Sequence, residues 1–387
     1  MIDVDEARAR LFAAAPRLAA ETVPLAHACG RTLAAPVRAV RSQPPADVSA
    51  MDGYAVDAAH PIEGVEIIGE SRAGAGFHGA LSKGSAVRIF TGAPLPPGAN
   101  AVLIQEDAAV EGTRLTARES VTPGAHVRRA GLDFAAGDDV LPAGRVLNPR
   151  HLALAASAGG GVVSVARRPR VAFLATGDEL VPPGAPVGRD QIVASTTLSL
   201  IEMVRAVGAE GFDLGIAPDD TDAIADAAAR GLSEADILVT LGGASVGDHD
   251  LVAPALSRLG VALDFWKVAV RPGKPLMFAS KPLVLGLPGN PVSGLVCTLL
   301  FLLPLLRVAQ GGAPGPELED AVLGAPLSAN GPRRDHVRAK RVEGRMVPFS
   351  RQDSSMLGVL SEADGLIVRM PHASAAQAGD PCKMIRL

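Results

Sequence analysis

Polar loops at the ends of expected strands carry most of the residues in this sequence that could do chemistry. Four such loops occupy residues 176–179, 219–220, 242–250 and 286–293. In an open α/β sheet, ligands bind beyond the carboxyl ends of the strands, so we expect these loops to meet at one place. Two of them are glycine-rich and lead into expected helices, where free backbone N–H groups suit a phosphate or another oxyanion.

The same loops carry three carboxylates, those of Glu179, Asp219 and Asp250. Carboxylates beside an anion site are useful when Mg²⁺ bridges them to phosphate oxygens. The alternative is that these acids only cap helices or stabilise turns, and for Asp219 both explanations stay open. For Glu179 and Asp250 the sequence favours a functional role.

A second candidate group consists of three cations, Lys267, Arg271 and Lys274, in the string WKVAVRPGKP. A strand that ends in such a string can direct cations past its tip toward an anionic ligand. No run of acids that could neutralise them lies nearby in the sequence. The alternative is an exposed cationic strand end without a ligand.

Three strings resemble known motifs, and two of them fail on context. GAGFHG at 74–79 fits G-x-G-x-x-G, but no helix is expected after it, so it predicts a hairpin turn. RPGK lacks the leading glycines of a phosphate-binding P-loop. GASVG at 243–247 fits G-x-S-x-G and makes an α/β serine hydrolase using Ser245 an alternative. That enzyme would need Asp335 with His336, or His372, to fold over the sheet, and the acids after Gly247 fit anion binding better.

Composition limits the class of protein. The 387 residues are 48% hydrophobic, with 37 basic against 41 acidic side chains and 3% aromatic residues. This balance argues against a nucleic-acid binder. The three cysteines are far apart and form no zinc-type spacing, which fits a reducing cytoplasm. The first residues, MIDVDEARAR, do not resemble a signal peptide, and the apolar run 294–306 is shorter than the ~20 residues that span a membrane, so we expect a buried helix.

Alternating strands and helices must position the loops. Short apolar runs at 171–176, 237–241 and 283–287 predict buried strands, and helical spacing follows at 197–207, from Thr221, at 251–259 and at 292–308. This order predicts a doubly wound, mostly parallel sheet over 166–312. Around it we expect a helical N-terminal domain (1–42 and 141–165), an inserted β-rich domain (43–140) and a C-terminal β-barrel-like domain (313–387).

Five strings in fixed order carry a family resemblance. They are SAMDGYA (49–55), FTGAP (90–94), TGDEL (176–180), GGASVG (242–247) and LPGNPVS (287–293). The chain resembles the molybdopterin molybdenumtransferases, the MoeA / gephyrin E-domain family, over essentially its whole length. The resemblance implies an elongated, four-part subunit and a cytoplasmic homodimer with its site at the subunit interface. It also implies the reaction, in which adenylylated molybdopterin and molybdate give molybdenum cofactor and AMP with Mg²⁺.

The resemblance also assigns roles to residues of this chain. It implies that Asp52, Thr91, Glu179, Asp219 and Asp250 are catalytic, with Glu179 and Asp250 as Mg²⁺ ligands. For molybdate it implies Ser293, one of Ser354 and Ser355, and one of Arg334 and Arg338. The further substrate-binding positions are Thr176, Gly242, Gly243, Ser245, Gly247, Lys267, Arg271, Lys274, Pro288 and Pro291. Partner proteins implied are an upstream adenylyltransferase and molybdoenzyme acceptors.

The sequence departs from the family pattern in three places. Relatives commonly have Asp-Ser-Asn after a Gly-x-Ile turn, where this chain reads QIVAST (191–196), so an acid and an amide are missing. Asp248 stands where Glu is usual, and Arg271 stands where Lys is frequent. The departure at 193–196 leaves open a scaffold paralogue with weakened chemistry. An adenylyl-transfer enzyme is disfavoured, because such enzymes resemble the middle domain alone.

Overall fold

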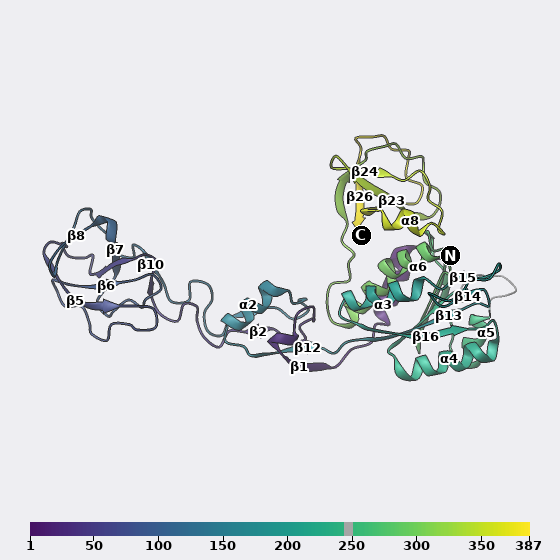
Figure 1. Ribbon diagram of the computed structural model, residues 1–387, viewed down its shortest axis with the longest axis horizontal. Helices are drawn as coiled ribbons and strands as arrows, with labels where there is room; N and C mark the ends of the chain where they lie inside the picture. Colours follow the sequence, from purple (N-terminus) through teal and green to yellow (C-terminus); the bar gives the residue numbers. More distant parts are fainter. Residues whose placement is uncertain (244–250) are drawn as a thin grey trace.

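The computed structural model describes residues 1–243 and 251–387 of the chain. Figure 1 shows an elongated molecule with a β domain at one end, a small linking domain next to it, and two packed domains at the other end. The loops singled out above belong to those two packed domains. The multidomain α/β architecture predicted from the sequence is therefore confirmed.

A six-stranded sheet with the order β16-β13-β17-β21-β20-β18 forms the centre of the α/β domain. Its first four strands are parallel, and β20 and β18 are antiparallel to their neighbours. The prediction of a mostly parallel sheet is confirmed. The strands are β13 (Arg170–Thr176), β16 (Glu210–Ala217), β17 (Ile237–Leu241), β18 (Phe265–Lys267), β20 (Pro275–Ser280) and β21 (Leu283–Leu287).

Helices cover both faces of this sheet, as a doubly wound fold requires. Along β13, Phe173 faces the core under α3, α6 and α7, whereas Leu174 faces the core under α4 and α5. Burial on both faces explains why this strand is apolar throughout rather than alternating. The helices are α3 (Thr196–Ala206), α4 (Thr221–Glu234), α5 (Val252–Arg258), α6 (Pro291–Cys297), the π-helical turn η3 (Thr298–Leu302) and α7 (Leu303–Ala309).

The stretch Pro291–Ala309, which joins α6, η3 and α7, is the apolar run noted in the sequence. It is 19 residues long with a mean hydropathy of 2.1, and 78% of its most apolar window is buried inside the protein. Among the described residues it alone has the length and composition to cross a membrane. Its side chains pack in the core of the α/β domain, so the buried helix predicted from the sequence is confirmed.

The N-terminal helix α1 (Val4–Ala13) belongs to the α/β domain, which corrects the predicted grouping of 1–42 in one domain. Val4, Ala7 and Leu11 are buried in the core that α3 and α7 share. The spacing i, i+3, i+7 gives this helix one apolar stripe, and α7 packs against the helix in this core. The prediction grouped α1 with the segment that follows it in sequence, but the helix packs in the core of the α/β domain.

The linking domain consists of two short antiparallel pairs and a helix. β1 (Ala20–Pro24) pairs with β12 (Val162–Ala166), and β2 (Val37–Arg38) pairs with β11 (Asp139–Leu141). Helix α2 (Pro149–Ser157) is capped by Asn148. Because β2 and β11 pair, the chain leaves this domain and returns to it at the same place.

The inserted β domain lies between β2 and β11. Its main sheet has the order β7-β4-β6-β5-β9-β8, and β3 pairs with β10 beside it. The segment 74–79 follows β5 as a turn and not as a helix, which confirms that it is not a nucleotide-binding loop. The elements are β3 (Val48–Ser49), β4 (Gly53–Val56), β5 (Val65–Ser71), β6 (Ser85–Ile89), β7 (Ala101–Ile104), η2 (Gln105–Asp107), β8 (Ala108–Glu111), β9 (Arg114–Ala117) and β10 (Val127–Arg128).

The C-terminal domain shares a sheet with the α/β domain. β19 (Val270–Arg271), which leaves the α/β domain, pairs in parallel with β23, so this sheet has the order β19-β23-β25-β26-β22. Backbone pairing therefore joins the two domains directly. The other elements are β22 (Glu319–Val322), β23 (Arg334–Val342), β24 (Arg345–Pro348), α8 (Leu357–Ser361), β25 (Gly365–Arg369) and β26 (Pro381–Arg386).

His336 on β23 is buried where these two domains meet, with 2% of its surface exposed. Its Nδ1 atom has no hydrogen-bond partner among the described residues. Burial lowers the pKa of His336 to about 4, and repulsion from Arg334 and Arg8 lowers it as well. A hydrogen bond to the backbone of Arg271 and the carboxylate of Asp335 act in the opposite direction but are weaker than burial. The folded protein thus holds this imidazole neutral.

We expect the free energy of unfolding to decrease as the pH is lowered, because of His336. Its folded pKa lies below the unfolded value of 6.5, so the unfolded chain binds the proton first and the loss grows between about pH 6.5 and pH 4. The loss should reach about 3 kcal/mol at most. Unfolding midpoints at pH 7 and pH 4.5 should differ less in His336→Leu than in the wild type, whereas exposed His27→Gln should behave as wild type. An equal pH dependence in His336→Leu would contradict this assignment.

Candidate active site

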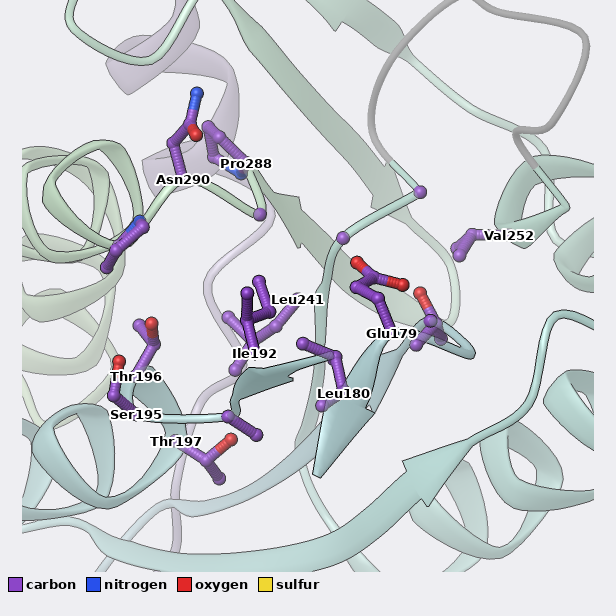
Figure 2. A pocket seen from close by; sticks show the side chains of 18 of the residues that line it. Glu179, Leu180, Ile192, Ser195, Thr196, Thr197, Leu241, Val252, Pro288 and Asn290 are labelled. Atoms are coloured by element: carbon purple, nitrogen blue, oxygen red, sulfur yellow. The ribbon is translucent and has the colours of Figure 1, made fainter. Parts of the chain in front are cut away.

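A cavity of about 890 Å³ lies at the carboxyl edge of the parallel sheet, beyond β13, β17 and β21. Figure 2 shows side chains from several separate segments pointing into it. The loops at 176–179, 219–220 and 286–293, and the described start of the loop at 242–250, all reach this cavity, as predicted. The predicted residues that line it are Thr176, Glu179, Asp219, Gly242, Gly243, Pro288, Pro291 and Ser355.

Backbone approaches closely to backbone at the centre of this edge. Gly242 has φ +97°, and a Cβ there would lie 2.8 Å from the carbonyl oxygen of Thr176. A Cβ on Gly289 would lie 3.4 Å from the Cα of Gly242. Glycine at 242 avoids a clash with Thr176, and its N–H donates to the carbonyl of Leu287 over 3.3 Å, which ties together the ends of β17 and β21.

The acids of the cavity are positioned by the ends of β13 and β16. Asp178 accepts a hydrogen bond of 3.0 Å from the backbone N–H of Asp219 through Oδ1, which ties the two loops together. Helix α4 is capped by Asp220, whose Oδ1 accepts from the N–H groups of Asp222 and Ala223. Capping is therefore not the role of Asp219, and both Asp219 and Glu179 line the cavity.

A group of hydroxyls that the sequence prediction missed lines the cavity at the start of α3. Ser195, Thr196 and Thr197 lie there together, as Figure 2 shows. Thr197 is only 5% exposed, and within the described part of the chain its hydroxyl forms no hydrogen bond. The signal was present, because serine and threonine before an apolar helical run mark a helix N-terminus. Asn290, at the start of α6, is a second lining residue that was missed.

The C-terminal domain supplies one wall of the cavity through Ser355 and Leu357. The backbone N–H of Val292 in α6 donates to the carbonyl of Ser354 over 3.2 Å, so this loop rests on the N-terminus of α6. Of the two serines left open by the sequence, Ser355 lines the cavity, and Ser354 contributes its backbone.

The predicted cationic corner does not line this cavity. Arg271 forms an ion pair with Asp335, which is 7% exposed, and this carboxylate raises the pKa of Arg271 further. Both residues border a separate cavity of about 340 Å³ in the C-terminal domain. The expectation that no acid neutralises these cations is wrong for Arg271, since its partner lies 64 residues away in sequence. Lys267 does not line the main cavity, and Lys274 is an exposed neighbour of Pro275, which does.

Three further predicted molybdate ligands also lie outside the cavity lining. Arg334 donates to both carboxylate oxygens of Asp5, over 2.9 and 2.6 Å. Arg338 is 2% exposed and bonds to Gln352 and to the carbonyl of Met356, over 3.2 and 3.3 Å. Ser293 is 4% exposed inside α6. Of the described residues that line the cavity, none is Lys or Arg.

Asp52 and Thr91 lie together, but in the inserted β domain at the far end of the subunit (Figure 1). The backbone N–H and the hydroxyl of Thr91 both donate to Asp52 Oδ1, over 2.8 and 2.9 Å. These bonds hold the pKa of the exposed Asp52 carboxyl below its usual range. The structure thus pairs these two predicted residues and separates them from the cavity within one chain.

Ser245, Gly247 and Asp250 lie outside the described residues. Their predicted roles remain predictions.

Comparison with known proteins decides the family. Residues 2–159 match the MoeA N-terminal region (domain I and II), residues 172–308 a probable molybdopterin binding domain, and residues 320–387 the MoeA C-terminal region (domain IV). A molybdopterin molybdenumtransferase of a Nostoc species is 39% identical over 76% of this chain and 70% of that protein. Molybdopterin molybdenumtransferase 2 of Mycobacterium tuberculosis is 37% identical over 89% of this chain and 90% of that protein. The chain belongs to the MoeA family.

Solved structures of MoeA proteins share the whole architecture. A crystal structure of a molybdopterin biosynthesis MoeA protein from Pyrococcus horikoshii has a TM-score of 0.89 at 25% identity, with complete coverage of both chains. A second from the same source has a TM-score of 0.85 at 28% identity and covers 100% of this chain. The four parts of this MoeA-family chain, including the remote β domain, therefore form the arrangement that these relatives have.

The close approach at Gly242 makes a prediction about stability. Gly242→Ala should lower the thermal midpoint by more than Gly260→Ala does. Both glycines have positive φ, at +97° and +75°, so alanine costs each about 1 kcal/mol of backbone strain. Only at Gly242 would the new Cβ also meet backbone, 2.8 Å from the Thr176 carbonyl, while nothing lies within 4 Å at Gly260. Equal midpoints for the two variants would contradict the close packing.

Proposed function

We propose that this MoeA-family enzyme is a molybdopterin molybdenumtransferase, which inserts molybdate into adenylylated molybdopterin and releases AMP. The observation that carries the proposal is the cavity itself. It combines acids, hydroxyls and glycine-rich backbone at the edge of the sheet, and its described lining includes no Lys or Arg. Such a lining suits a large phosphorylated ligand that arrives with a divalent cation.

Backbone and hydroxyl groups would hold the anionic parts of the substrate. The glycine backbone at Gly243 and Gly289, and the start of α3 with its Ser195 and Thr197 hydroxyls, line the same space. Donors of this kind bind phosphate oxygens without a charged side chain. The segment that departs from the family pattern is part of this wall, and it offers the Ser195 and Thr196 hydroxyls without the acid and the amide that relatives commonly have.

The residues present fit Mg²⁺. Glu179 and Asp219 offer hard carboxylate oxygens, and Mg²⁺ typically takes one or two carboxylates and completes its shell with phosphates and water. Asp250 is the third carboxylate that we expect to contribute. When bound, Mg²⁺ supplies positive charge that offsets the phosphate charge and so supports breaking of the phosphoanhydride.

The remaining work of the chain is binding and orientation. Molybdate oxygens and the dithiolene sulfurs of the substrate do the bond exchange, so the protein does not have to supply a nucleophile. For molybdate, Lys274 is the cation nearest the cavity along the chain, since it precedes Pro275 of the lining. A serine hydrolase is disfavoured, because Asp335 is engaged with Arg271 and His336 is buried at a domain junction.

We also propose that the enzyme acts as a cytoplasmic homodimer. Asp52 and Thr91 form a polar pair on an exposed loop of a domain that lies far from the cavity of its own chain. A second subunit placed antiparallel could bring that pair to the cavity. An upstream adenylyltransferase that supplies the substrate, and molybdoenzymes that accept the product, are the partner classes this reaction requires.

Glu179→Gln should lower Mg²⁺-dependent AMP release at least about tenfold, because an amide is a weaker ligand for a hard cation than a carboxylate. The assay mixes the enzyme with adenylylated molybdopterin, Mg²⁺ and molybdate and measures AMP and cofactor. Glu202→Gln is the control, since Glu202 is an exposed acid of α3 that pairs with Arg205. Full activity in Glu179→Gln would refute the metal assignment, and an inactive wild type would favour the scaffold alternative.

Mixing inactive Asp52→Ala and Glu179→Ala subunits tests the dimer. If the two acids serve one site from different chains, a mixed dimer contains one intact site, and random exchange should recover about one quarter of wild-type activity. Subunit exchange is verified separately with tagged chains. No recovery after confirmed exchange would place both acids in the site of a single chain.

A further inference from the structure

We propose that Asp5 is a positioning residue: its ion pair with Arg334 fixes the C-terminal domain against the α/β domain, so that the loop 352–357 closes the cavity. This inference rests on the proposed function, because the cavity is the substrate site. Asp5 lies in the first turn of α1 and does not line the cavity. Its effect on the reaction would therefore be exerted through the domain arrangement.

The ion pair itself connects the two ends of the chain. Arg334, at the start of β23, donates from both terminal nitrogens to the two oxygens of Asp5, a planar fork geometry that restrains orientation as well as distance. The Arg334 side chain is 16% exposed. This arginine lowers the pKa of Asp5, so the pair stays charged at neutral pH.

Helix α1 is a rigid support for this contact. Its apolar face is buried in the α/β core, and Arg8 donates over 2.7 Å to the carbonyl of Leu300 in η3. Arg8 also donates to the carbonyl of Gly315 in the segment that leads to the C-terminal domain. The Asp5 carboxylate is thus fixed to the α/β domain through α1, and it contacts the C-terminal domain through Arg334.

The start of β23 is attached on its opposite face as well. Asp335 pairs with Arg271 of β19, and the N–H of Arg334 donates to the carbonyl of Ala269 over 2.8 Å. Consecutive strand residues point to opposite faces, so Arg334 and Asp335 reach the α/β domain on two sides. These two attachments on opposite faces add to the apolar packing between the two domains in restraining rotation about the β19–β23 pairing.

β23 transmits this placement to the cavity wall. Four residues beyond Arg334, Arg338 lies on the same face and holds the loop through Gln352 and the carbonyl of Met356. The amide of Gln352 donates back to the carbonyl of Arg338 over 2.9 Å. The next residues of this loop, Ser355 and Leu357, line the cavity. A change of tilt at Arg334 would therefore move the cavity wall.

Loss of the pair should raise KM and leave kcat unchanged. If only a fraction of molecules has the wall in place, the apparent affinity falls by that fraction while the closed molecules react as before. For one ion pair whose carboxylate is exposed to water we expect at most about a fivefold rise in KM. A variant that merely unfolds would lower kcat through loss of active enzyme instead.

The kinetic test compares Asp5→Ala with Glu6→Ala. Both acids lie in the first turn of α1, so both variants lose the same helix-dipole stabilisation, but Glu6 pairs only with Arg10 of its own helix. We expect the fivefold rise only in Asp5→Ala, recovery in Asp5→Glu, and no additional rise when Arg334→Met is combined with Asp5→Ala. Equal KM values in Asp5→Ala and Glu6→Ala, or additive effects in the double variant, would overturn the proposal.

A distance measurement tests the same proposal without the reaction. Spin labels on Ala229→Cys of α4 and Ala375→Cys of the C-terminal domain, both exposed positions, report the separation of the two domains once Cys29 and Cys382 are replaced by Ser. The distance distribution should broaden in Asp5→Ala and stay narrow in Glu6→Ala. An unchanged distribution in Asp5→Ala refutes the positioning role even if the enzyme is active, whereas broadening in an enzyme without AMP release refutes only the proposed function.

Discussion

Parallel pairing of β16, β13, β17 and β21 is the constraint on which the rest of the structure depends. Parallel strands end at a common edge, so four segments from across the α/β domain deliver their loops to one place. The close approach at Gly242 and Gly289 is a consequence, because neighbouring strands are separated by about 4.8 Å and their loops inherit that spacing. Helix starts at α3 and α6 then face the same space, and the cavity follows from topology before any reactive side chain is considered.

Charge is distributed around this cavity in an unexpected way. Acids and neutral donors line its described part, while the nearby arginines form ion pairs at domain junctions. An anionic substrate must then be neutralised by a cation that arrives with it, or by groups from another chain. The remote Asp52 and Thr91 pair cannot supply this positive charge, since Asp52 is itself an acid. A divalent ion meets the electrostatic requirement, whereas the proposed dimer rests on the distance of this pair from the cavity of its own chain.

Local signals in the sequence were sufficient to predict many strands, helices and loops of the α/β domain. Strand and helix periodicity located β17 and β21, and glycine-rich strings located the loops, because both depend on neighbours within a few residues. Ion pairs between residues that lie far apart in the chain could not be predicted from the sequence. Asp335 lies 64 residues from Arg271, and Asp5 lies 329 residues from Arg334, so the arginines looked like free cations. Helix α1 was assigned to the wrong domain for the same reason, since its apolar stripe does not say which core will cover it.

Arrangement of domains, rather than a single side chain, forms the cavity in this fold. The C-terminal domain completes the cavity through Ser355 and Leu357. The short β19 pairing, the backbone hydrogen bond from Val292 to Ser354 and apolar packing of the C-terminal domain in the α/β core together limit its rotation. The ion pairs on either face of β23 restrain that rotation, and the cost of desolvating them is small because each keeps one partner exposed to water. The resemblance assigns Arg334 or Arg338 to molybdate binding. In the structure, these two arginines instead hold the C-terminal loop that forms one wall of the cavity.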